Sequence, residues 1–594
     1  MTGKGECTIN DSYNTNHMRF RRLALYLDRL EKTSSRIEIT KILAELFAES
    51  DKEEIDKITY LLLGCLVPNY KGIVFNLAER MMLQIIAKAY NKEIEQVKVL
   101  YKRIGDLGNV VEQLSIIEKS NNLERRELLV KEVYKSLMEI ALDEGEGSQE
   151  RKIGKMAKLL SNLDSLSVRF LARIPVGRLR LGFSDKTILD ALSWMEVGNK
   201  GKKQLLERAY QVVPDIGILA KKVKEVGIDK ACKEVRPVVG IPVLPMLAQR
   251  LKSPAEMIGK MKKVFIEPKF DGLRILIHYK KVNGKEEIRA FTRNLNDVAD
   301  MFPELKEVGK SLNATQVILD TEAVGMDSEM IKLANFQTTM QRRRKHEIEK
   351  KAQEIPLKFE VFDIIYKDGE NFMDTPYFKR REILERTIKE GKLLALTEGV
   401  LTNDPEIIEK EYKRRIKEGL EGVIVKKFDT LYIPGRTGWR WVKMKEEEKA
   451  ISKLADTIDC VVMGYYTGRG KRTQFGLGGF LVGVLDEETI KTVSKIGTGL
   501  TDEQFREMYK RLKKLETKDK PKEYGEINKA LIPDFWVVPS LIVEIAADEI
   551  TKSPVHTAGF ALRFPRLVRF RDDKSYKQTT TISELQKLYK LQGR

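Results

Sequence analysis

Apolar positions in the first third of the chain recur at every third or fourth residue. Clear examples are the segments 23–30, 39–47 and 75–90, in which strand-like alternation is rare. Because an α-helix has 3.6 residues per turn, this spacing gathers the apolar side chains on one helical face. We therefore expect a mainly helical region from Met18 to about Lys233.

The pattern changes after residues 236–248, a stretch with three prolines and a glycine. Short runs rich in β-branched and aromatic residues follow, and such runs are typical of strands. These runs are 264–266, 274–279, 287–293, 316–324 and 357–366. Helical spacing returns at 340–354 and 378–390, so the sequence predicts an α+β region over 236–447. We interpret the strongly charged run 340–351 as a solvated helix face rather than a site.

A charged connector after Lys445 introduces the last region, 448–594. Strand-like runs at 460–466 and 478–485 flank a turn rich in glycine and arginine, and 581–594 regains helical spacing. Short strands separated by glycine turns predict a small β-barrel. Residues 1–17 are polar and are either a flexible extension or a misassigned start.

The composition indicates the kind of molecule that the protein binds. Within 594 residues, 107 Lys and Arg face 88 Asp and Glu, which gives a net charge of +19. The length predicts three or four domains, and 42% hydrophobic residues are enough for real cores. The positive excess favours a polyanion, most simply nucleic acid, over a lysine- and glutamate-rich surface without a partner.

The four cysteines, Cys7, Cys65, Cys232 and Cys460, are far apart and contain no C-x-x-C pair. We therefore expect neither a structural zinc site nor a disulfide framework. A reducing, intracellular (cytoplasmic) setting is expected instead. The sequence has no apolar run long enough to span a membrane and no apolar signal core at its start.

One lysine stands where a nucleophile could be built. The stretch 264–274 runs V-F-I-E-P-K-F-D-G-L-R, so Lys269 follows an apolar strand and precedes an Asp-Gly turn. Partial burial and the nearby Arg274 would both disfavour its ammonium form, as a nucleophilic lysine requires. A lysine in an ordinary hairpin turn is the alternative at this point.

Six further segments add candidate chemistry. Thr292-Arg293-Asn294 closes a strand, Glu421 and Lys426 lie on one strand-like run, and 563–574 holds several arginines. Three sets of residues each share a strand face: Asp320 with Glu322, Glu360 with Phe362, and Trp441 with Lys443 and Lys445. In the helical region, 169–184 gathers Arg169, Arg173, Arg178 and Arg180 around small residues, which suits either phosphate contacts or a solvated basic loop. Taken singly, each segment also has a plain structural explanation.

Taken in this order, the segments resemble the covalent nucleotidyltransferases, and among them the archaeal and eukaryotic-type ATP-dependent DNA ligases. The resemblance covers about residues 18–594 and includes the helical segments 25–36, 100–110 and 145–152. It implies an all-α DNA-binding domain over 18–235, an α+β adenylation domain over 236–447, and an OB-fold β-barrel with a C-terminal helix over 448–594.

The resemblance also implies a mechanism and a set of partners. Lys269 would form a lysyl-AMP with ATP, AMP would pass to the 5′-phosphate at a nick in duplex DNA, and the 3′-hydroxyl would displace it. Mg²⁺ or Mn²⁺ would assist. The protein would act as a monomer in DNA replication, repair and recombination, and a sliding clamp is a further candidate partner.

Roles of individual residues follow from their positions in this pattern. The implied ATP-binding residues are Glu267, Arg274, Arg293, Glu322, Phe362, Arg436, Lys443 and Lys445. Glu322 and Glu421 would bind the metal, and Arg563, Arg566, Asp573 and Lys574 would orient pyrophosphate. Arg178 and Arg180 would contact DNA.

Three departures from the family pattern matter. Pro268 precedes the lysine and lacks an N–H, which implies an edge position or a bulge. Thr437 stands where the family often has an arginine, with Arg436 beside it. The Q-x-x-F-F clamp-binding segment of many archaeal relatives is not found between 111 and 140, so clamp binding is unsupported.

Several alternatives use related chemistry or none. An RNA ligase or an mRNA-capping guanylyltransferase would use the same lysine, but the large helical region argues against both. An NAD-dependent ligase is disfavoured because no four-cysteine zinc module is present. A non-catalytic DNA-binding protein would be expected to have lost Lys269, Glu322, Glu421 or the two late lysines.

Overall fold

The computed structural model describes residues 17–118, 127–445 and 457–591, except 178, 180, 182, 252, 328, 331, 335, 344–346, 436–437, 469–471, 473–474 and 548. The chain divides into two compact units. The first comprises Met1–Ala78, Glu124–Phe170 and Ile174–Glu446, and the second comprises Glu79–Leu123, Leu171–Arg173 and Glu447–Arg594.

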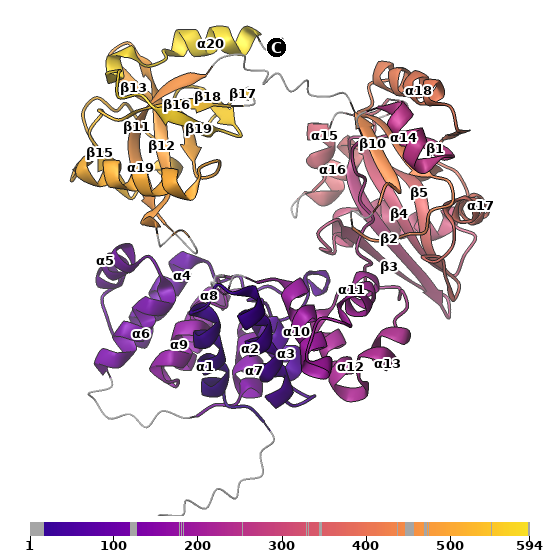
Figure 1. The fold of residues 1–594 in the computed structure, drawn as a ribbon, viewed down its shortest axis with the longest axis horizontal. Helices are drawn as coiled ribbons and strands as arrows, with labels where there is room; N and C mark the ends of the chain where they lie inside the picture. The colour runs from indigo at the N-terminus through magenta and orange to yellow at the C-terminus, as the bar shows by residue number, and fades with distance from the viewer. Residues whose placement is uncertain are drawn as a thin grey trace, which may run out of the picture. The chain divides into compact units, whose positions relative to one another are not determined.

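The helical part of the first unit follows the apolar spacing of the sequence (Figure 1). Its helices are α1 (Phe20–Glu31), α2 (Arg36–Glu49), α3 (Ile55–Leu62), η1 (Asn69–Lys71), α7 (Val130–Ala141), α8 (Ser148–Ser161), α9 (Ser165–Leu171), α10 (Asp185–Val197), α11 (Lys203–Val212), α12 (Ile216–Val226) and α13 (Ile228–Lys233). Along α1, Phe20, Leu23 and Leu27 are almost fully buried, as their three- and four-residue spacing predicts.

A buried carboxylate fastens this helical part to the sheets that follow it in the first unit. Asp215, the N-cap of α12, accepts hydrogen bonds from the hydroxyls of Tyr60 at 2.5 Å and Tyr70 at 2.8 Å. The ring of Tyr70 belongs to an apolar cluster with Met246 and Trp441. The turn around η1 therefore packs against the α+β region of the first unit.

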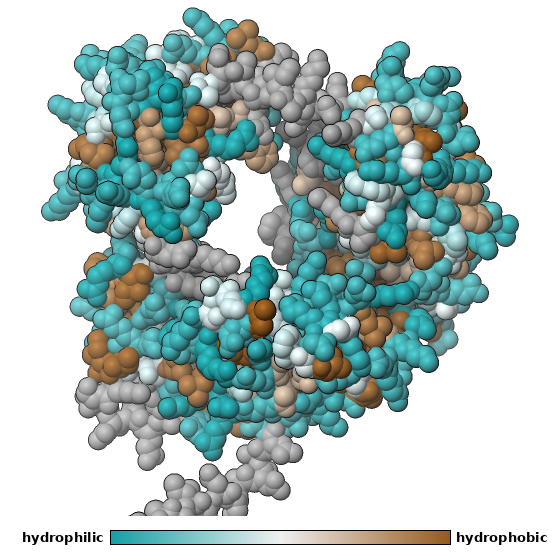
Figure 2. All heavy atoms as spheres, in the orientation of Figure 1, coloured by the Kyte–Doolittle hydropathy of each residue, from teal (hydrophilic) through white to brown (hydrophobic). Residues whose placement is uncertain are grey.

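Three helices of the second unit come from the helical region: α4 (Glu79–Ala89), α5 (Ile94–Ile104) and α6 (Leu107–Glu118). Val97, Val110 and Val111 are buried here, whereas Val99, Ile116 and Ile117 are more than half exposed. Figure 2 shows apolar side chains on the surface over α5 and α6. These three exposed residues are referred to below as the α5–α6 patch.

A four-stranded antiparallel sheet forms one wall of the α+β region. It consists of β1 (Val264–Lys269), β8 (Val400–Thr402), β9 (Gly422–Lys427) and β10 (Trp441–Lys445), in the order β10-β9-β1-β8. One face buries Val264, Val423 and Val442 against α14 (Pro254–Met261) and α18 (Pro405–Lys417). Since successive residues of a strand point to opposite faces, the other face is left for the polar side chains.

A six-stranded sheet forms the second wall. It contains β2 (Leu273–Val282), β3 (Lys285–Thr292), β4 (Gln316–Gly325), β5 (Leu357–Lys367), β6 (Glu370–Asn371) and β7 (Leu394–Leu396). The accompanying helices are η3 (Ala299–Met301), η4 (Pro303–Ser311), α15 (Phe336–Met340), α16 (Ile348–Glu354) and α17 (Tyr377–Thr387). One face packs Ile277 and Leu319 against Leu384 of α17, and the other packs Leu276 and Ile318 in a cluster that includes Trp441 of β10.

The second unit also holds the C-terminal region. Its elements are β11 (Ile458–Thr467), β12 (Leu477–Asp486), β13 (Thr489–Ile496), α19 (Asp502–Lys514), β14 (Glu516–Thr517), η6 (Lys529–Leu531), β15 (Phe535–Val537), β16 (Ile542–Ala546), β17 (Glu549–Lys552), β18 (Phe560–Arg563), β19 (Arg566–Phe570), η7 (Tyr576–Gln578) and α20 (Ile582–Leu591). Seven strands form one sheet, and β17 and β18 form a separate pair. Phe505 and Met508 of α19 and Leu585 of α20 complete its core.

Most predicted elements are confirmed, with two differences. Of the helix expected over 340–354, only the last part is helical, as α16; α15 already ends at Met340, and a turn follows it. The strand pairing of the C-terminal region closes no ring among its described residues, so the predicted barrel is not confirmed. In the described part of the chain, no helix is long and apolar enough to cross a membrane.

Candidate active site

The polar face of the four-stranded sheet carries side chains in three rows across β1, β9 and β10. The register pairs Phe265 with Lys426 and Lys426 with Trp441; Glu267 with Ile424 and Ile424 with Lys443; and Lys269 with Gly422 and Gly422 with Lys445. Because the rows follow one another along the strands, the sheet changes from an aromatic end to a lysine-rich end over three rows. Lys269 lies at the lysine-rich end.

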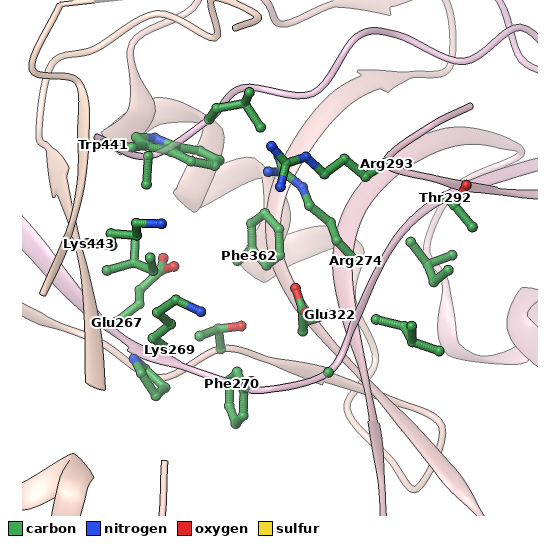
Figure 3. Close-up of a pocket in the computed structure, with 18 of the residues that line it drawn as sticks. Glu267, Lys269, Phe270, Arg274, Thr292, Arg293, Glu322, Phe362, Trp441 and Lys443 are labelled. Atoms are coloured by element: carbon green, nitrogen blue, oxygen red, sulfur yellow. The ribbon is translucent and has the colours of Figure 1, made fainter. Parts of the chain in front are cut away.

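A cavity of about 650 Å³ opens over these rows and is closed on its other side by the six-stranded sheet. That sheet contributes Arg274 of β2, Glu322 of β4 and Phe362 of β5 (Figure 3). The turn Thr292-Arg293-Asn294 after β3 lines it as well. The structure thus brings together the predicted residues Glu267, Lys269, Arg274, Arg293, Glu322, Phe362 and Lys443 in one cavity.

Two glycines allow the close approaches at the lysine-rich end. A Cβ on Gly272, in the turn after Lys269, would lie 2.4 Å from the carbonyl oxygen of Ala323 on β4. A Cβ on Gly422 would lie 2.2 Å from the carbonyl oxygen of Met444, and its φ of +141° favours glycine. The Asp-Gly turn therefore serves close packing between the two sheets as well as chain reversal.

Lys269 pairs with a carboxylate rather than with the cation expected beside it. Its ammonium donates to Glu421, whose other oxygen lies 3.2 Å from Lys445 Nζ. Burial alone would raise the pKa of Glu421, but the hydrogen bonds from Lys269 and Lys445 lower it below its ordinary value. For Lys443, burial together with the nearby Arg250 and Lys269 lowers the pKa. Positive charge is thus concentrated around one acidic residue.

Arg274 is fully occupied by the protein. Its guanidinium binds both oxygens of buried Asp320, at 2.9 and 2.6 Å, and donates to the carbonyl oxygen of Met246 at 2.6 Å. The hydroxyl of Tyr432 donates to the same Asp320 at 2.7 Å. Arg274 therefore fixes the wall of the cavity, and the sequence-based expectation that it lies beside Lys269 as a neighbouring cation is replaced by this carboxylate pairing.

The aromatic end holds a buried ion pair. Lys426 Nζ lies 2.7 Å from Glu267 and donates to the carbonyl oxygen of Phe362 at 2.7 Å. The hydroxyl of Tyr377 donates to the other oxygen of Glu267, and the rings of Phe362, Tyr377 and Trp441 lie 4.6 to 4.9 Å from Lys426 Nζ. Burial raises the pKa of Glu267 and lowers that of Lys426, and their mutual attraction opposes both shifts.

Glu322 is a carboxylate with an unusual protonation equilibrium. Burial raises its pKa to about 7, the nearby Arg274 and Lys269 oppose the shift, and Asp320 and Asp271 add to it. Glu421 accepts a hydrogen bond from Lys269, and the charge of Lys269 opposes the rise in the pKa of Glu322. Both carboxylates therefore lie near Lys269. Among the described residues, no three Asp, Glu, His or Cys side chains form a ready metal cluster.

Pro268 occupies the edge position that its sequence context implies. The carbonyl of Lys269 accepts from the N–H of Glu421 on the β9 side, so the backbone of Pro268 faces the opposite side. There the pairing with β8 ends at Ile266, and no register shift interrupts the pairing with β9. Proline therefore costs no ladder hydrogen bond, and Glu267 and Lys269, two residues apart, face the same cavity.

The remaining predicted residues lie elsewhere. Arg178, Arg180 and Arg436 are outside the described residues. In the C-terminal region, Arg563 and Arg566 are exposed on β18 and β19, Asp573 pairs with Arg571 at 2.7 Å, and Lys574 pairs with Asp459 at 2.5 Å.

Two arginines considered for phosphate contacts are bound within the protein. Arg173 is buried and binds Asp106 at 2.7 Å, and Arg169 binds Asp28 and Glu31. Burying a guanidinium requires such a partner, so these two side chains stabilise the fold. The phosphate-binding interpretation of 169–184 is wrong for both.

Several cavity residues were not among the predicted ligands: Ile424, Lys426, Trp441, Met340 and Arg343. Alternation along 439–445 could have found Trp441, which lies two residues from the predicted Lys443. Ile424 and Lys426 lie three and five residues from the predicted Glu421, so alternation from that residue does not find them. Arg343 is hidden within a charged run and gives no periodic signal.

A lysine set among phosphate-attracting cations, with an aromatic slot at the other end of the same sheet face, suits transfer of a nucleotide through a covalent lysine adduct. This fold and site define the class of covalent nucleotidyltransferases.

Comparison with known proteins then identifies the family. Models of the DNA ligase N terminus, the ATP dependent DNA ligase domain and the ATP dependent DNA ligase C terminal region match residues 19–193, 245–445 and 473–574. The probable DNA ligase of Dictyoglomus turgidum is 40% identical over 96% of this chain and 98% of its own, and the DNA ligase of Saccharolobus solfataricus is 36% identical over 97% and 98%. The chain belongs to the ATP-dependent DNA ligases, whose general function is the sealing of nicks in DNA.

A solved structure shares the three-part architecture. Pmar-Lig_PreS3 is 20% identical, covers 92% of this chain and 99% of its own, and has a TM-score of 0.52. At this identity the likeness concerns the fold alone.

Proposed function

We propose that the chain seals nicks in duplex DNA through a lysyl-AMP on Lys269. The carrying observation is the row order of the four-stranded sheet, which runs from an aromatic slot at Trp441 to Lys269 and Lys445 at the other end. The lysine amine attacks the α-phosphorus of ATP and pyrophosphate leaves. AMP then passes to the 5′-phosphate of the nick, and the 3′-hydroxyl displaces AMP. Each displacement exchanges one bond at phosphorus for another.

In the first step, Glu421 orients the attacking lysine. The attacking form of Lys269 is the neutral amine, whereas its ammonium donates to Glu421 in the structure. Before the attack, Glu421 orients the Lys269 side chain by accepting a hydrogen bond from its ammonium. Lys443 and Lys445 hold the α-phosphate, and Arg293 provides a further cation on the opposite wall.

The aromatic end is proposed to bind adenine. Phe362 and Ile424 line the cavity from facing sheets, so a flat base fits between them. Glu267 and Lys426 place a hydrogen-bond acceptor beside a donor, which matches the amino group and the ring nitrogen on adenine's pairing edge. Guanine presents the opposite order there, so this pair favours ATP over GTP.

A divalent cation, Mg²⁺ or Mn²⁺, is proposed to be held by Glu322 and Glu421. Two protein carboxylates and the oxygens of a bound triphosphate suit Mg²⁺, which usually combines few carboxylates with phosphates and water. The donor set therefore fits the ion without a larger acidic cluster. When bound, the metal would neutralise charge on the transferring phosphoryl group.

The regions outside the cavity are proposed to bind duplex DNA. The net charge of +19 supports this, as do the exposed Arg563 and Arg566 of a C-terminal region that we propose to be an OB-fold. Arg563, Arg566, Asp573 and Lys574 would orient pyrophosphate in the first step, and Arg178 and Arg180 would contact DNA. The proposed biological roles are DNA replication, repair and recombination, carried out by a monomer.

A sliding clamp remains a proposed partner, and the α5–α6 patch is one described surface with exposed apolar side chains. The cytoplasmic location expected from the scattered cysteines also stays a prediction; Cys65, Cys232 and Cys460 are free thiols.

The test is sealing of a singly nicked, labelled duplex with a panel of ATP, ADP, GTP and NAD in the presence of Mg²⁺. We expect sealing with ATP and little with GTP or NAD. Sealing of a nicked RNA duplex in preference to DNA would favour the RNA ligase alternative, and transfer of GMP to an RNA 5′-diphosphate end would favour the capping enzyme. Failure to seal DNA with any nucleotide would contradict the proposal.

A further inference from the structure

The turn after α15 is firmly attached to the sheet that carries Glu322. Thr339 Oγ1 accepts the N–H of Gly325, the last residue of β4, at 3.1 Å. Arg342 is buried, binds both oxygens of Glu304 at 2.9 Å and donates to the carbonyl oxygen of Ile355 at 2.7 Å. The interpretation of 340–351 as a solvated helix face is therefore wrong at this point, because Arg342 anchors the turn.

The next residue, Arg343, faces the active-site cavity. It lines the cavity together with Met340, Arg293 and Glu322, and its side chain is exposed. Among the described residues, no carboxylate forms an ion pair with it, in contrast to Arg274, which binds Asp320 and the carbonyl oxygen of Met246. Arg342 thus anchors the turn, and Arg343 lies at the cavity.

Arg343 reaches the cavity from a different element than the three lysines. The α-phosphate end is served by Lys269, Lys443 and Lys445, all on the four-stranded sheet. Arg343 belongs to the turn that follows α15, and it lines the same cavity. A planar guanidinium with free N–H groups is suited to bidentate contact with a phosphate.

We propose that Arg343 binds a DNA backbone phosphate beside the nick and so positions the 5′-phosphate for AMP transfer. This assignment rests on the proposed function and names a substrate contact for its second step. Arg342 acts through Arg343 as a positioning residue, because it holds the turn in place.

The experiment compares Arg343→Ala, Arg343→Lys and the wild type, with Arg386→Ala as a matched control. Arg386 is an exposed arginine of α17 that does not line the cavity, so its removal changes the net charge equally. Each protein is first charged with α-labelled ATP, purified as lysyl-AMP and mixed with an excess of nicked duplex. The readouts are the rate of AMP transfer to DNA and the dissociation constant for the nick at several salt concentrations.

We expect Arg343→Ala to form lysyl-AMP like the wild type but to transfer AMP roughly tenfold more slowly at subsaturating DNA, the loss typical of one charged hydrogen-bonding contact. The slope of log affinity against log salt should become shallower by about one phosphate equivalent. Arg343→Lys should restore part of both, and Arg386→Ala should match the wild type.

Two results would overturn the assignment. Transfer rate and salt slope equal to those of Arg386→Ala would show that Arg343 does not contact DNA. A defect confined to lysyl-AMP formation would place it on ATP instead. Absence of lysyl-AMP in the wild type would refute the proposed function itself, which is a distinguishable outcome.

Discussion

Replacing Glu322 by glutamine is expected to make the unliganded enzyme more stable while abolishing ligation. Burial raises the pKa of Glu322 to about 7, so near neutral pH the folded state must ionise a carboxylate in an unfavourable setting. The stability associated with its proton is fully present below the ordinary value of 4.5 and is lost as pH rises through the folded value. Glutamine keeps the shape of the protonated acid and has no such loss.

The shift of the pKa from 4.5 to about 7 corresponds to at most about 3 kcal/mol. Since the carboxylate borders an open cavity, solvent screening reduces this, and we expect about 1 to 2 kcal/mol at pH 8.5 and nearly nothing at pH 4.5. The assay is urea unfolding of wild type and Glu322→Gln, without nucleotide or metal, followed by tryptophan fluorescence.

Glu382→Gln, an exposed change on α17, is the matched control and should show no pH-dependent difference. If Glu322→Gln were less stable than the wild type at pH 8.5, or differed from it equally at both pH values, the burial argument would be refuted.

Further predictions concern the fold and DNA binding. Asp363→Ala should cost about 3 to 5 kcal/mol of unfolding free energy in a urea titration, because it leaves the guanidinium of Arg380 buried without its carboxylate; a cost below about 1 kcal/mol would contradict this. Phe564 is 69% exposed at a φ of +50°, unusual for a bulky residue, and lies between exposed arginines. Phe564→Ala should weaken nick binding roughly tenfold, as loss of an aromatic contact with a base would, and leave lysyl-AMP formation unchanged in the labelling assay; equal binding would show that the ring does not touch DNA. Nick binding by the wild type should weaken steeply with salt in a titration, about 0.9 log unit per phosphate contact for each log unit of salt, and a flat response would argue against a basic DNA-binding surface.

Periodicity was sufficient for much of the fold. The spacing of Phe20, Leu23 and Leu27 predicts the buried face of α1, and the short apolar runs predict β1 to β5. A strand's side-chain alternation also predicts that Trp441, Lys443 and Lys445 share a face, because that depends on one segment alone.

Contacts between distant segments could not be predicted from periodicity. That Asp320 pairs with Arg274, and Glu421 with Lys269, depends on how two separate sheets face each other. The composition of the run 340–351 gives no sign that Arg342 is buried, since Glu304 lies 38 residues away. Local patterns therefore indicate which residues carry the chemistry, whereas tertiary packing decides which of them remain available to substrate.

The most direct test of the account is covalent labelling of the wild type and Lys269→Ala with α-labelled ATP and Mg²⁺, followed by acid treatment. The phosphoramidate bond to lysine is acid-labile, so the wild type should carry a label that acid releases as AMP, and Lys269→Ala should carry none. Lys410→Ala, an exposed change on α18, should label like the wild type. Retention of acid-labile AMP by Lys269→Ala would contradict the assignment of Lys269 as the nucleophile.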